Sequence, residues 1–482
     1  MKVPVNGIFC RFTFYIIKSI SLVMNRIKSL NPQYVFIVLG LIYGIAFLVL
    51  IPPFQVPDEY EHYYKSWDIS NGNLIPEKIG NKAGVSVPES VKIMTDNVYQ
   101  KWKYYILNNQ SIDIGYLLNF PLKSSDNVFV DISKYAVVTY SPLPYLASAL
   151  SIALGKLFDL SPLILLYLGR FGNLLLWLFI IFLAIRITPI FKWGFLAIAL
   201  MPMTLFQAGS LSADGIAISL SFLTIAIFLK LALDDSIKKI TSKHISVMVI
   251  ITLLLSLAKM PYIMLILLFF LIPSKKFNGK TKMFKIFGFM FLLSVLVIAS
   301  WNFMVNGLYM PLDPGISLKD QLFYILHYPV DFIQTMLNTS SQYAGELPFI
   351  VVGNWAYANS PIPSLIYYIS FFIILLVAAF DKGSFKINLK QRYIILGIFL
   401  LITGTIFVLE YLTWTYTGAP LIHGIQGRYL IPALPLLFLT LYEKGERTKN
   451  RLLVESMLSL LIILILLKVV FIFINYYYMF YF

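Results

Sequence analysis

A short stretch near the start of the chain holds the residues best suited to chemistry. Asp58, Glu59, Glu61 and His62 lie within five residues and follow directly on the apolar run 34–51. Ionisable groups placed where lipid gives way to water are costly and usually functional. On one helix Asp58, Glu61 and His62 would share a face, because residues three or four apart are neighbours. The pattern has a second interpretation, since acidic residues also stabilise the first turn of a helix.

Polar residues also border apolar runs further along the chain. Asp214 lies in a serine-rich turn, and it is either a functional carboxylate or an N-cap of the following helix. Arg170 and Lys259 are either ligand-binding cations or anchors at the membrane interface. The stretch 423–429 contains two glycines, which let the backbone approach a ligand closely. It also supplies three candidate binding side chains, His423, Gln426 and Arg428.

The composition places these residues in a membrane protein. Of the 482 residues, 59% are hydrophobic and 13% are charged, about half the charged share of an average soluble chain. The net charge of +15 comes from clusters in short loops between apolar runs, which is the positive-inside pattern. We therefore expect contact with membrane lipids and no nucleic-acid binding. The single cysteine, Cys10, excludes an internal disulfide and a cysteine-based zinc site.

The basic clusters also predict the topology. If all of them are cytoplasmic, an even number of spans separates each pair. Three apolar runs lie between the first two clusters, so one of them does not span. The shortest, 142–158, opens with two prolines and is expected to lie at the outer interface.

We therefore predict an all-α polytopic membrane protein with about eleven transmembrane helices and two folded extracytoplasmic segments. A basic cytoplasmic or interfacial segment, 1–33, precedes the first span. The first extracytoplasmic segment is 52–161, the central spans occupy 162–303, the second extracytoplasmic segment is 304–363, and the last spans lie in 364–482. The spans are expected at 34–51, 162–185, 193–209, 212–230, 245–259, 261–273, 284–303, 364–380, 393–412, 429–443 and 452–475.

This topology gathers Asp58, Asp214, Lys259, Arg170 and the 423–429 stretch on the outer side. The sequence contains no Walker A loop, dinucleotide fingerprint, zincin motif or GxSxG elbow. The cytoplasmic loops are short and offer no nucleotide site. Chemistry on the outer side would therefore need a substrate other than a nucleotide, and a lipid-linked donor meets that need.

The arrangement resembles the GT-C superfamily of polytopic glycosyltransferases. In that superfamily a catalytic carboxylate opens the large loop after the first span, as Asp58 does here, and a second acidic residue lies in the outer turn between spans three and four, as Asp214 does. The chain also looks like an uncharacterised family of bacterial predicted membrane proteins. The matching pieces are Pro57-Asp58-Glu59 with His62, Tyr140 to Tyr145, Leu168-Gly169-Arg170, the Ser212/Asp214 turn, Gly353-Asn354-Trp355, and Gly424 to Tyr429 with Pro432.

The resemblance implies a GT-C-like bundle in the bacterial cell membrane, with the N-terminus cytoplasmic. It implies inverting transfer of a sugar from a polyprenyl-phosphate-linked donor to a cell-envelope glycan acceptor. Asp58 is then expected to be the general base, with Glu59 the second choice, and Asp214 to orient the acceptor or help hold a cation.

The cations are expected to hold the departing phosphate. Arg428, together with Gln426 and His423, is the first choice for this phosphate clamp. Arg170 and Lys259 are weaker candidates.

Three alternatives remain open at this stage. A divalent metal ion held by Asp58, Glu61 and His62 would suit the chemistry of those ligands. In the second alternative the protein is a transporter or flippase for lipid-linked sugars, and in the third it is a non-catalytic partner in polysaccharide assembly.

Overall fold

The computed structural model describes residues 30–107, 126–344 apart from Leu312 and Pro314, 362–443 apart from Lys382 and Ser384, and 451–478. Most of the predicted segment 1–33 lies outside the described residues, as does Gly353-Asn354-Trp355.

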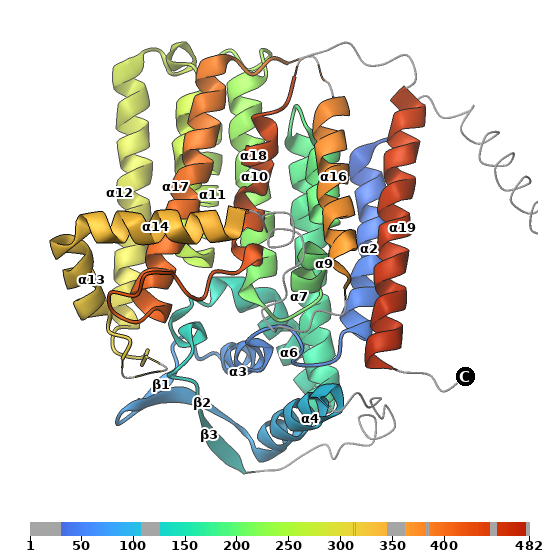
Figure 1. Ribbon diagram of the computed structural model, residues 1–482, viewed down its shortest axis with the longest axis vertical. Coiled ribbons are helices and arrows are strands. Elements are labelled where there is room, and N and C mark those ends of the chain that lie inside the picture. Colours follow the sequence, from blue (N-terminus) through green and yellow to red (C-terminus); the bar gives the residue numbers. More distant parts are fainter. Residues whose placement is uncertain are drawn as a thin grey trace, which may run out of the picture.

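A bundle of apolar helices forms most of the described chain (Figure 1). Six of the described helices are long and apolar enough to cross a membrane: α2 (Pro32–Leu50), α7 (Pro162–Ile187), α10 (Ala213–Leu233), α12 (Lys280–Met304), α17 (Leu389–Trp414) and α19 (Arg451–Tyr477). Shorter bundle helices are α8 (Lys192–Ala199), α9 (Pro202–Ala208), α11 (Ser242–Ala258), η3 (Met260–Leu271), η4 (Ser274–Phe277), α16 (Ser364–Phe380), η5 (Gly427–Ala433) and α18 (Leu434–Leu439). The predicted all-α polytopic membrane class is confirmed.

Three predicted spans are interrupted or tightened, and in two of them a proline lies at the interruption. The run 193–209 is divided into α8 and α9, and α9 begins at Pro202. The run 261–273 is a 3-10 helix with Pro261 in its first turn. The run 429–443 is a 3-10 turn containing Pro432 followed by α18. A proline removes a backbone donor and clashes with the preceding turn, so a regular helix does not continue through it.

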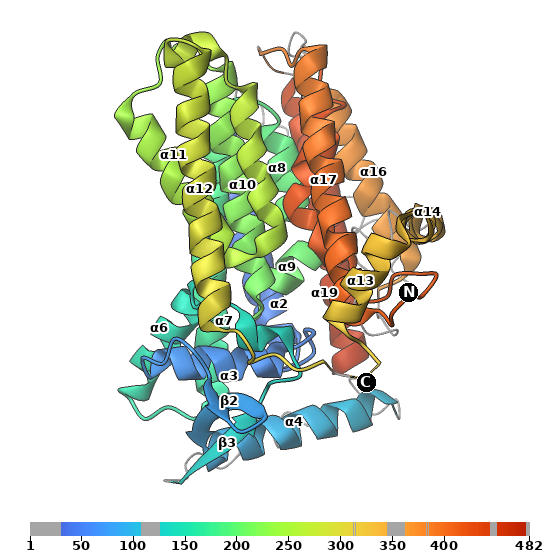
Figure 2. The ribbon, with the colours of Figure 1, turned by 90° about the vertical axis from the view of Figure 1, so that its left-hand side faces the viewer.

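One end of the bundle carries a small layer of mixed structure, which we call the sheet end. It contains α3 (Glu59–Ser70), β1 (Glu77–Ile79), β2 (Lys82–Pro88), α4 (Glu89–Leu107), β3 (Asn127–Asp131), η1 (Ala136–Thr139) and η2 (Leu143–Tyr145). Its strands form an antiparallel sheet in the order β1-β2-β3, with Gly84 opposite both Glu77 and Asp131. Figure 2 shows α3, α4 and the sheet below the ends of the long helices. The sequence did not predict this sheet.

The basic segments meet at the other end of the bundle. Lys276 donates hydrogen bonds to the carbonyls of Leu231 and Asp234, which end α10. Arg392 at the start of α17 donates to the carbonyls of Thr440 and Tyr442 after α18. The hydrogen bonds of Lys276 and Arg392 therefore hold basic loops at one end of the bundle, in agreement with the predicted clustering of these loops on one side.

The run 142–158 forms η2 and the helix α6 (Leu146–Lys156), which packs beside α3 and α7 at the sheet end (Figure 2). Leu146, Leu150 and Leu154 recur every four residues and are about half exposed. Such an apolar stripe suits a helix that lies in a membrane interface.

The second predicted outer segment contains α13 (Leu318–His327) and α14 (Pro329–Ala344). The two helices are separated at Tyr328, because the residue before a proline disfavours the helical conformation.

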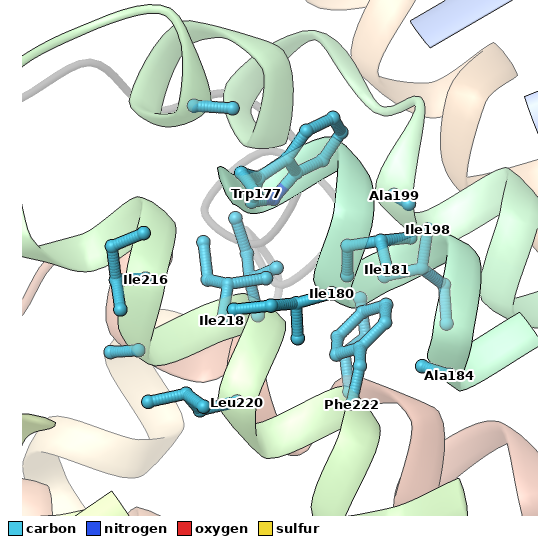
Figure 3. Packing of buried hydrophobic residues seen from close by; sticks show 14 of the residues in the cluster. Trp177, Ile180, Ile181, Ala184, Ile198, Ala199, Ile216, Ile218, Leu220 and Phe222 are labelled. Carbon is cyan, nitrogen blue, oxygen red and sulfur yellow. The ribbon is translucent and has the colours of Figure 1, made fainter. Parts of the chain in front are cut away.

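The core of the bundle is built on α7 and α10. In Figure 3, Trp177, Ile181 and Ala184 of α7 lie beside Ile198 of α8 and Phe222 of α10. All five side chains are buried. This packing fixes the helices whose ends at the sheet end carry Arg170 and Asp214.

Candidate active site

A cavity of about 540 Å³ lies where the bundle meets the sheet end. Its walls come from α3, the loop around η1, the end of α11, the start of η3, α12, α17 and the segment before η5. Its polar and charged lining residues include Asp58, His62, Asp214, Lys259, Asn302, Glu410, Gln426 and Arg428. The apolar walls include Ile298 and Trp301 of α12 and Ile406, Leu409 and Trp414 of α17. The charged residues of the cavity therefore lie next to a largely apolar wall formed by the membrane helices α12 and α17.

Asp58 reaches this cavity through an unusual backbone conformation. It precedes α3 with φ 60° and ψ 16°, which is the left-handed region. Aspartate is one of the few non-glycine residues that enter this region readily, and backbone strain of this kind gathers at functional sites. The side chain is 42% exposed, so it is much more accessible than the carboxylate of Asp214, which also lines the cavity.

Arg428 joins two carboxylates from distant parts of the chain. Its Nη2 lies 3.5 Å from Oδ2 of Asp58, and its Nε lies 3.2 Å from Oδ2 of Asp214. Lys259 Nζ lies 2.5 Å from the other oxygen of Asp214 and 4.4 Å from the ring centre of Tyr429. We call Asp58, Asp214, Lys259 and Arg428 the charged cluster.

The turn before α10 aims Asp214 at these cations. The N-cap of α10 is Ser212, whose hydroxyl accepts a hydrogen bond from the Asp214 backbone N–H. The N-cap interpretation of Asp214 is therefore wrong, because Ser212 fills that place. The Asp214 side chain is left to pair with Lys259 and Arg428, and it is 7% exposed.

Glu59 and Arg170 form a separate, fully buried pair. Arg170 donates from Nε to Oε1 of Glu59 at 2.8 Å and from Nη2 to Oε2 at 2.5 Å. Both side chains have 0% exposure. Neither residue lines the cavity, so the structure does not place Glu59 as a base or Arg170 as a phosphate ligand.

This pair holds the segment that precedes Asp58. Arg170 also donates to the carbonyls of Leu48 and Ile51 at the end of α2, and to that of Pro52. Glu59 accepts from the backbone N–H groups of Phe54 and Leu211. Helix ends leave such backbone groups without partners inside the helix. Arg170 and Glu59 therefore fix the turn between α2 and α3.

His62 lines the cavity but turns its ring nitrogen Nδ1 to the hydroxyl of Tyr145, 2.7 Å away. Burial lowers the pKa of His62 to about 3, the charge of Asp214 opposes this shift, and Arg428 and Lys259 add to it. The imidazole is therefore neutral at ordinary pH.

Glu61 is buried and does not line the cavity. Burial raises its pKa to about 9, and the charge of Asp58 adds to the shift. Its neighbour Tyr60 donates a hydrogen bond of 2.5 Å to the hydroxyl of Tyr135, which lines the cavity.

The metal-site hypothesis for Asp58, Glu61 and His62 does not fit this geometry. Within the described ranges, no three His, Cys, Asp or Glu side chains converge as metal ligands. The shared helix face assumed for them is lost because Asp58 precedes α3 in a left-handed conformation.

The 423–429 stretch is divided between the cavity and the surface. Gln426 and Arg428 line the cavity, whereas His423 does not and its side chain is exposed. Gly424 has φ +85°, and a Cβ added there would lie 2.7 Å from Oε2 of Glu410. The backbone of Gly424 therefore does approach another group closely, as expected, but that group is the Glu410 side chain and not a ligand.

Glu410 is the functional candidate that sequence reasoning missed. It lies near the end of α17, inside the run predicted as span 393–412, and lines the cavity. An acidic residue within an apolar run is itself a signal of function, and Glu410 is the only one in that run.

The Tyr140 to Tyr145 motif closes one side of the cavity. Ser141 donates to the carbonyl of Leu257 at the end of α11, at 2.6 Å. Trp301 of α12 donates to the carbonyl of Thr139 at 2.8 Å. These two bonds connect the loop of the sheet end to α11 and α12.

Comparison with known proteins places the chain in a family without assigning it an activity. No functionally curated protein matches the sequence, and no solved structure matches it either. The matching family model is described as a predicted membrane protein family, DUF2142, and it covers residues 41–437. That range includes the charged cluster, Glu410 and most of the bundle. The chain therefore belongs to the DUF2142 family of predicted membrane proteins.

Proposed function

We propose that this protein is a glycosyltransferase of the bacterial cell membrane that uses a polyprenyl-phosphate-linked sugar. One observation carries the proposal. An accessible carboxylate, Asp58, and two cations, Lys259 and Arg428, meet in one cavity whose walls continue along the apolar helices α12 and α17. A base and a phosphate clamp are the two parts that such a transfer requires.

Arg428 suits the role of the clamp because its hydrogen-bonding capacity is incompletely used. Its Nη1 atom is buried and has no hydrogen-bond partner among the described residues. A guanidinium holds phosphate oxygens with paired donors. Lys259, bound to Asp214 at 2.5 Å, supplies a second positive charge for the phosphate.

Asp58 suits the role of the base because its carboxylate is exposed to the cavity while its backbone is held by neighbouring structure. Glu59, the next residue, is fixed by Arg170. The base is therefore positioned by a residue that does not itself meet the substrate. A catalytic group held this way needs little reorganisation before reaction.

The apolar wall fits the lipid part of the donor. Ile298, Ile406 and Leu409 belong to α12 and α17, both long enough to cross a membrane. The phosphate would then lie at the charged cluster and the polyprenyl chain along these helices. The basic loops lie at the opposite end of the bundle, so the positive-inside rule puts the sheet end outside the cell.

The proposed step is a single displacement at the anomeric carbon. The acceptor hydroxyl oxygen forms the new glycosidic bond as its proton passes to Asp58. The bond between the anomeric carbon and the phosphate oxygen breaks, and polyprenyl phosphate leaves with its charge held by Arg428 and Lys259. A displacement of this kind inverts the anomeric configuration of the sugar, and the acceptor is a cell-envelope glycan.

The experiment is a deletion of the gene in its native cell, followed by complementation. We expect the deletion to remove one sugar from the envelope glycan and to raise the corresponding polyprenyl-phosphate sugar. The wild-type gene should restore both, and Arg428→Met, expressed to the same level in the membrane, should restore neither. An unchanged glycan in the deletion, or full complementation by Arg428→Met, would contradict the proposal.

A further inference from the structure

Two buried oxygens in the cavity have no partner to donate to them. Oε2 of Glu410 and Oε1 of Gln426 make no hydrogen bond to any residue that the structure describes. Both residues line the cavity. Buried polar atoms are nearly always hydrogen-bonded, and the exceptions commonly await a ligand or a water.

The two residues that carry these oxygens lie close together in the cavity wall. The Glu410 carboxyl packs against the backbone of Gly424, since an added Cβ there would lie 2.7 Å from Oε2. Gln426 follows two residues later, which limits its Cα to about 7 Å from that of Gly424. Trp414, one helical turn after Glu410, touches the same glycine through its Cβ, which would lie 3.0 Å from the added atom.

The two oxygens form a region that accepts hydrogen bonds, and a region that donates hydrogen bonds lies in the same cavity. Arg428 follows Gln426 by two residues and keeps a buried Nη1 without a partner. A ligand that satisfies both regions carries an anionic group close to groups that donate hydrogen bonds. A glycosyl phosphate has this pattern, because its hydroxyl groups lie beside its phosphate.

We infer that Glu410 and Gln426 bind hydroxyl groups of the donor sugar and thereby select it. The inference rests on the proposed function and deepens it, since Arg428 and Lys259 would hold the phosphate of the same molecule. Trp301 and Trp414 line the cavity and supply apolar surface for the C–H faces of the sugar. A site whose buried polar groups are left unpaired discriminates strongly against an analogue that lacks the hydroxyl.

The test is equilibrium binding to the purified full-length protein in detergent, measured by scintillation proximity with tritiated lipids. The probes are decaprenyl phosphate alone and decaprenyl phosphate carrying glucose, galactose, mannose or arabinose. The wild type should bind one sugar-bearing lipid about ten-fold more tightly than the bare lipid. Glu410→Leu and Gln426→Leu should each reduce that ratio to near one.

Thr413→Val is the matched control. Thr413 lines the same cavity one turn from Glu410, but its hydroxyl already donates to the carbonyl of Leu409 at 2.8 Å. This variant should keep the wild-type ratio. The inference is overturned if no sugar-bearing lipid binds more tightly than the bare lipid, or if the two leucine variants keep the ratio. Failure of every lipid to bind, bare decaprenyl phosphate included, would instead overturn the proposed function.

Discussion

Replacing Arg170 by methionine tests whether the buried Glu59–Arg170 pair positions the site or binds substrate. The change leaves the Glu59 carboxylate, with 0% exposure, dependent on two backbone donors. It also removes the donors to the carbonyls of Leu48, Ile51 and Pro52. Removing one partner of a buried ion pair costs about 3–5 kcal/mol. We therefore expect a large fall in the melting temperature of the detergent-solubilised protein.

The companion variant combines Glu59→Gln with Arg170→Met, which removes the buried charge as well. It should melt above Arg170→Met alone, with a coupling of about 0.5–3 kcal/mol between the two positions. Melting is followed by fluorescence-detected size-exclusion chromatography after heating. Arg186→Met, an exposed arginine on the same helix α7, is the control and should melt as the wild type does.

A different result would refute the positioning role. If Arg170→Met melts like the wild type but no longer binds decaprenyl phosphate, Arg170 acts on the ligand, as the sequence alone suggested. If the single and double variants melt alike, the two side chains are not coupled.

Three further predictions follow from the cavity and its surroundings. Burial keeps Glu61 protonated up to about pH 9, against an ordinary pKa of 4.5, so this group stabilises the fold less as pH rises between those values. Glu61→Gln should therefore melt above the wild type at about pH 8 and alongside it at about pH 5; a difference independent of pH would contradict this. Gly424→Ala should cost about 1–2 kcal/mol, because it strains a positive φ and pushes on Glu410. Gly404→Ala, inside α17 and with no neighbouring side chain within 4 Å of the added Cβ, should melt at or slightly above the wild-type temperature. Lys259→Met should weaken decaprenyl phosphate binding about ten-fold without unfolding the protein, since Asp214 keeps Arg428 as a partner; unchanged affinity would exclude Lys259 from the clamp.

The positions of the bundle helices were predictable because a membrane span requires a long apolar run, although only six of the described helices are long enough to cross a membrane. Each predicted span contains a helix of the bundle. Counting spans between basic clusters also singled out 142–158, and α6 there shows an exposed leucine stripe. The sheet was not predictable in the same way, because β1 is three residues long and offers too little alternation to identify a strand.

The site was predictable as a gathering of residues but not in its internal roles. Asp58, Asp214, Lys259 and Arg428 meet as the topology required. Glu59, adjacent to Asp58, pairs with Arg170 inside the bundle instead. Asp58 has a left-handed backbone and precedes α3, whereas Glu59 is the first residue of the helix, so the two carboxylates point in different directions. Only the tertiary structure decides which of the two faces the cavity. Glu410 was hidden for another reason, since it lies inside a run that reads as an ordinary span.

The most direct test of the account is sugar transfer by Asp58→Asn. Asparagine accepts the left-handed backbone of this position, so the variant removes the carboxylate charge and leaves the turn intact. Purified protein in liposomes is given each tritiated decaprenyl-phosphate sugar with native envelope glycan, and labelled glycan is counted. We expect transfer by the wild type, a loss of about 100-fold or more in Asp58→Asn, and binding of decaprenyl phosphate by both proteins. Transfer at the wild-type rate by Asp58→Asn would contradict the assignment of Asp58 as the base.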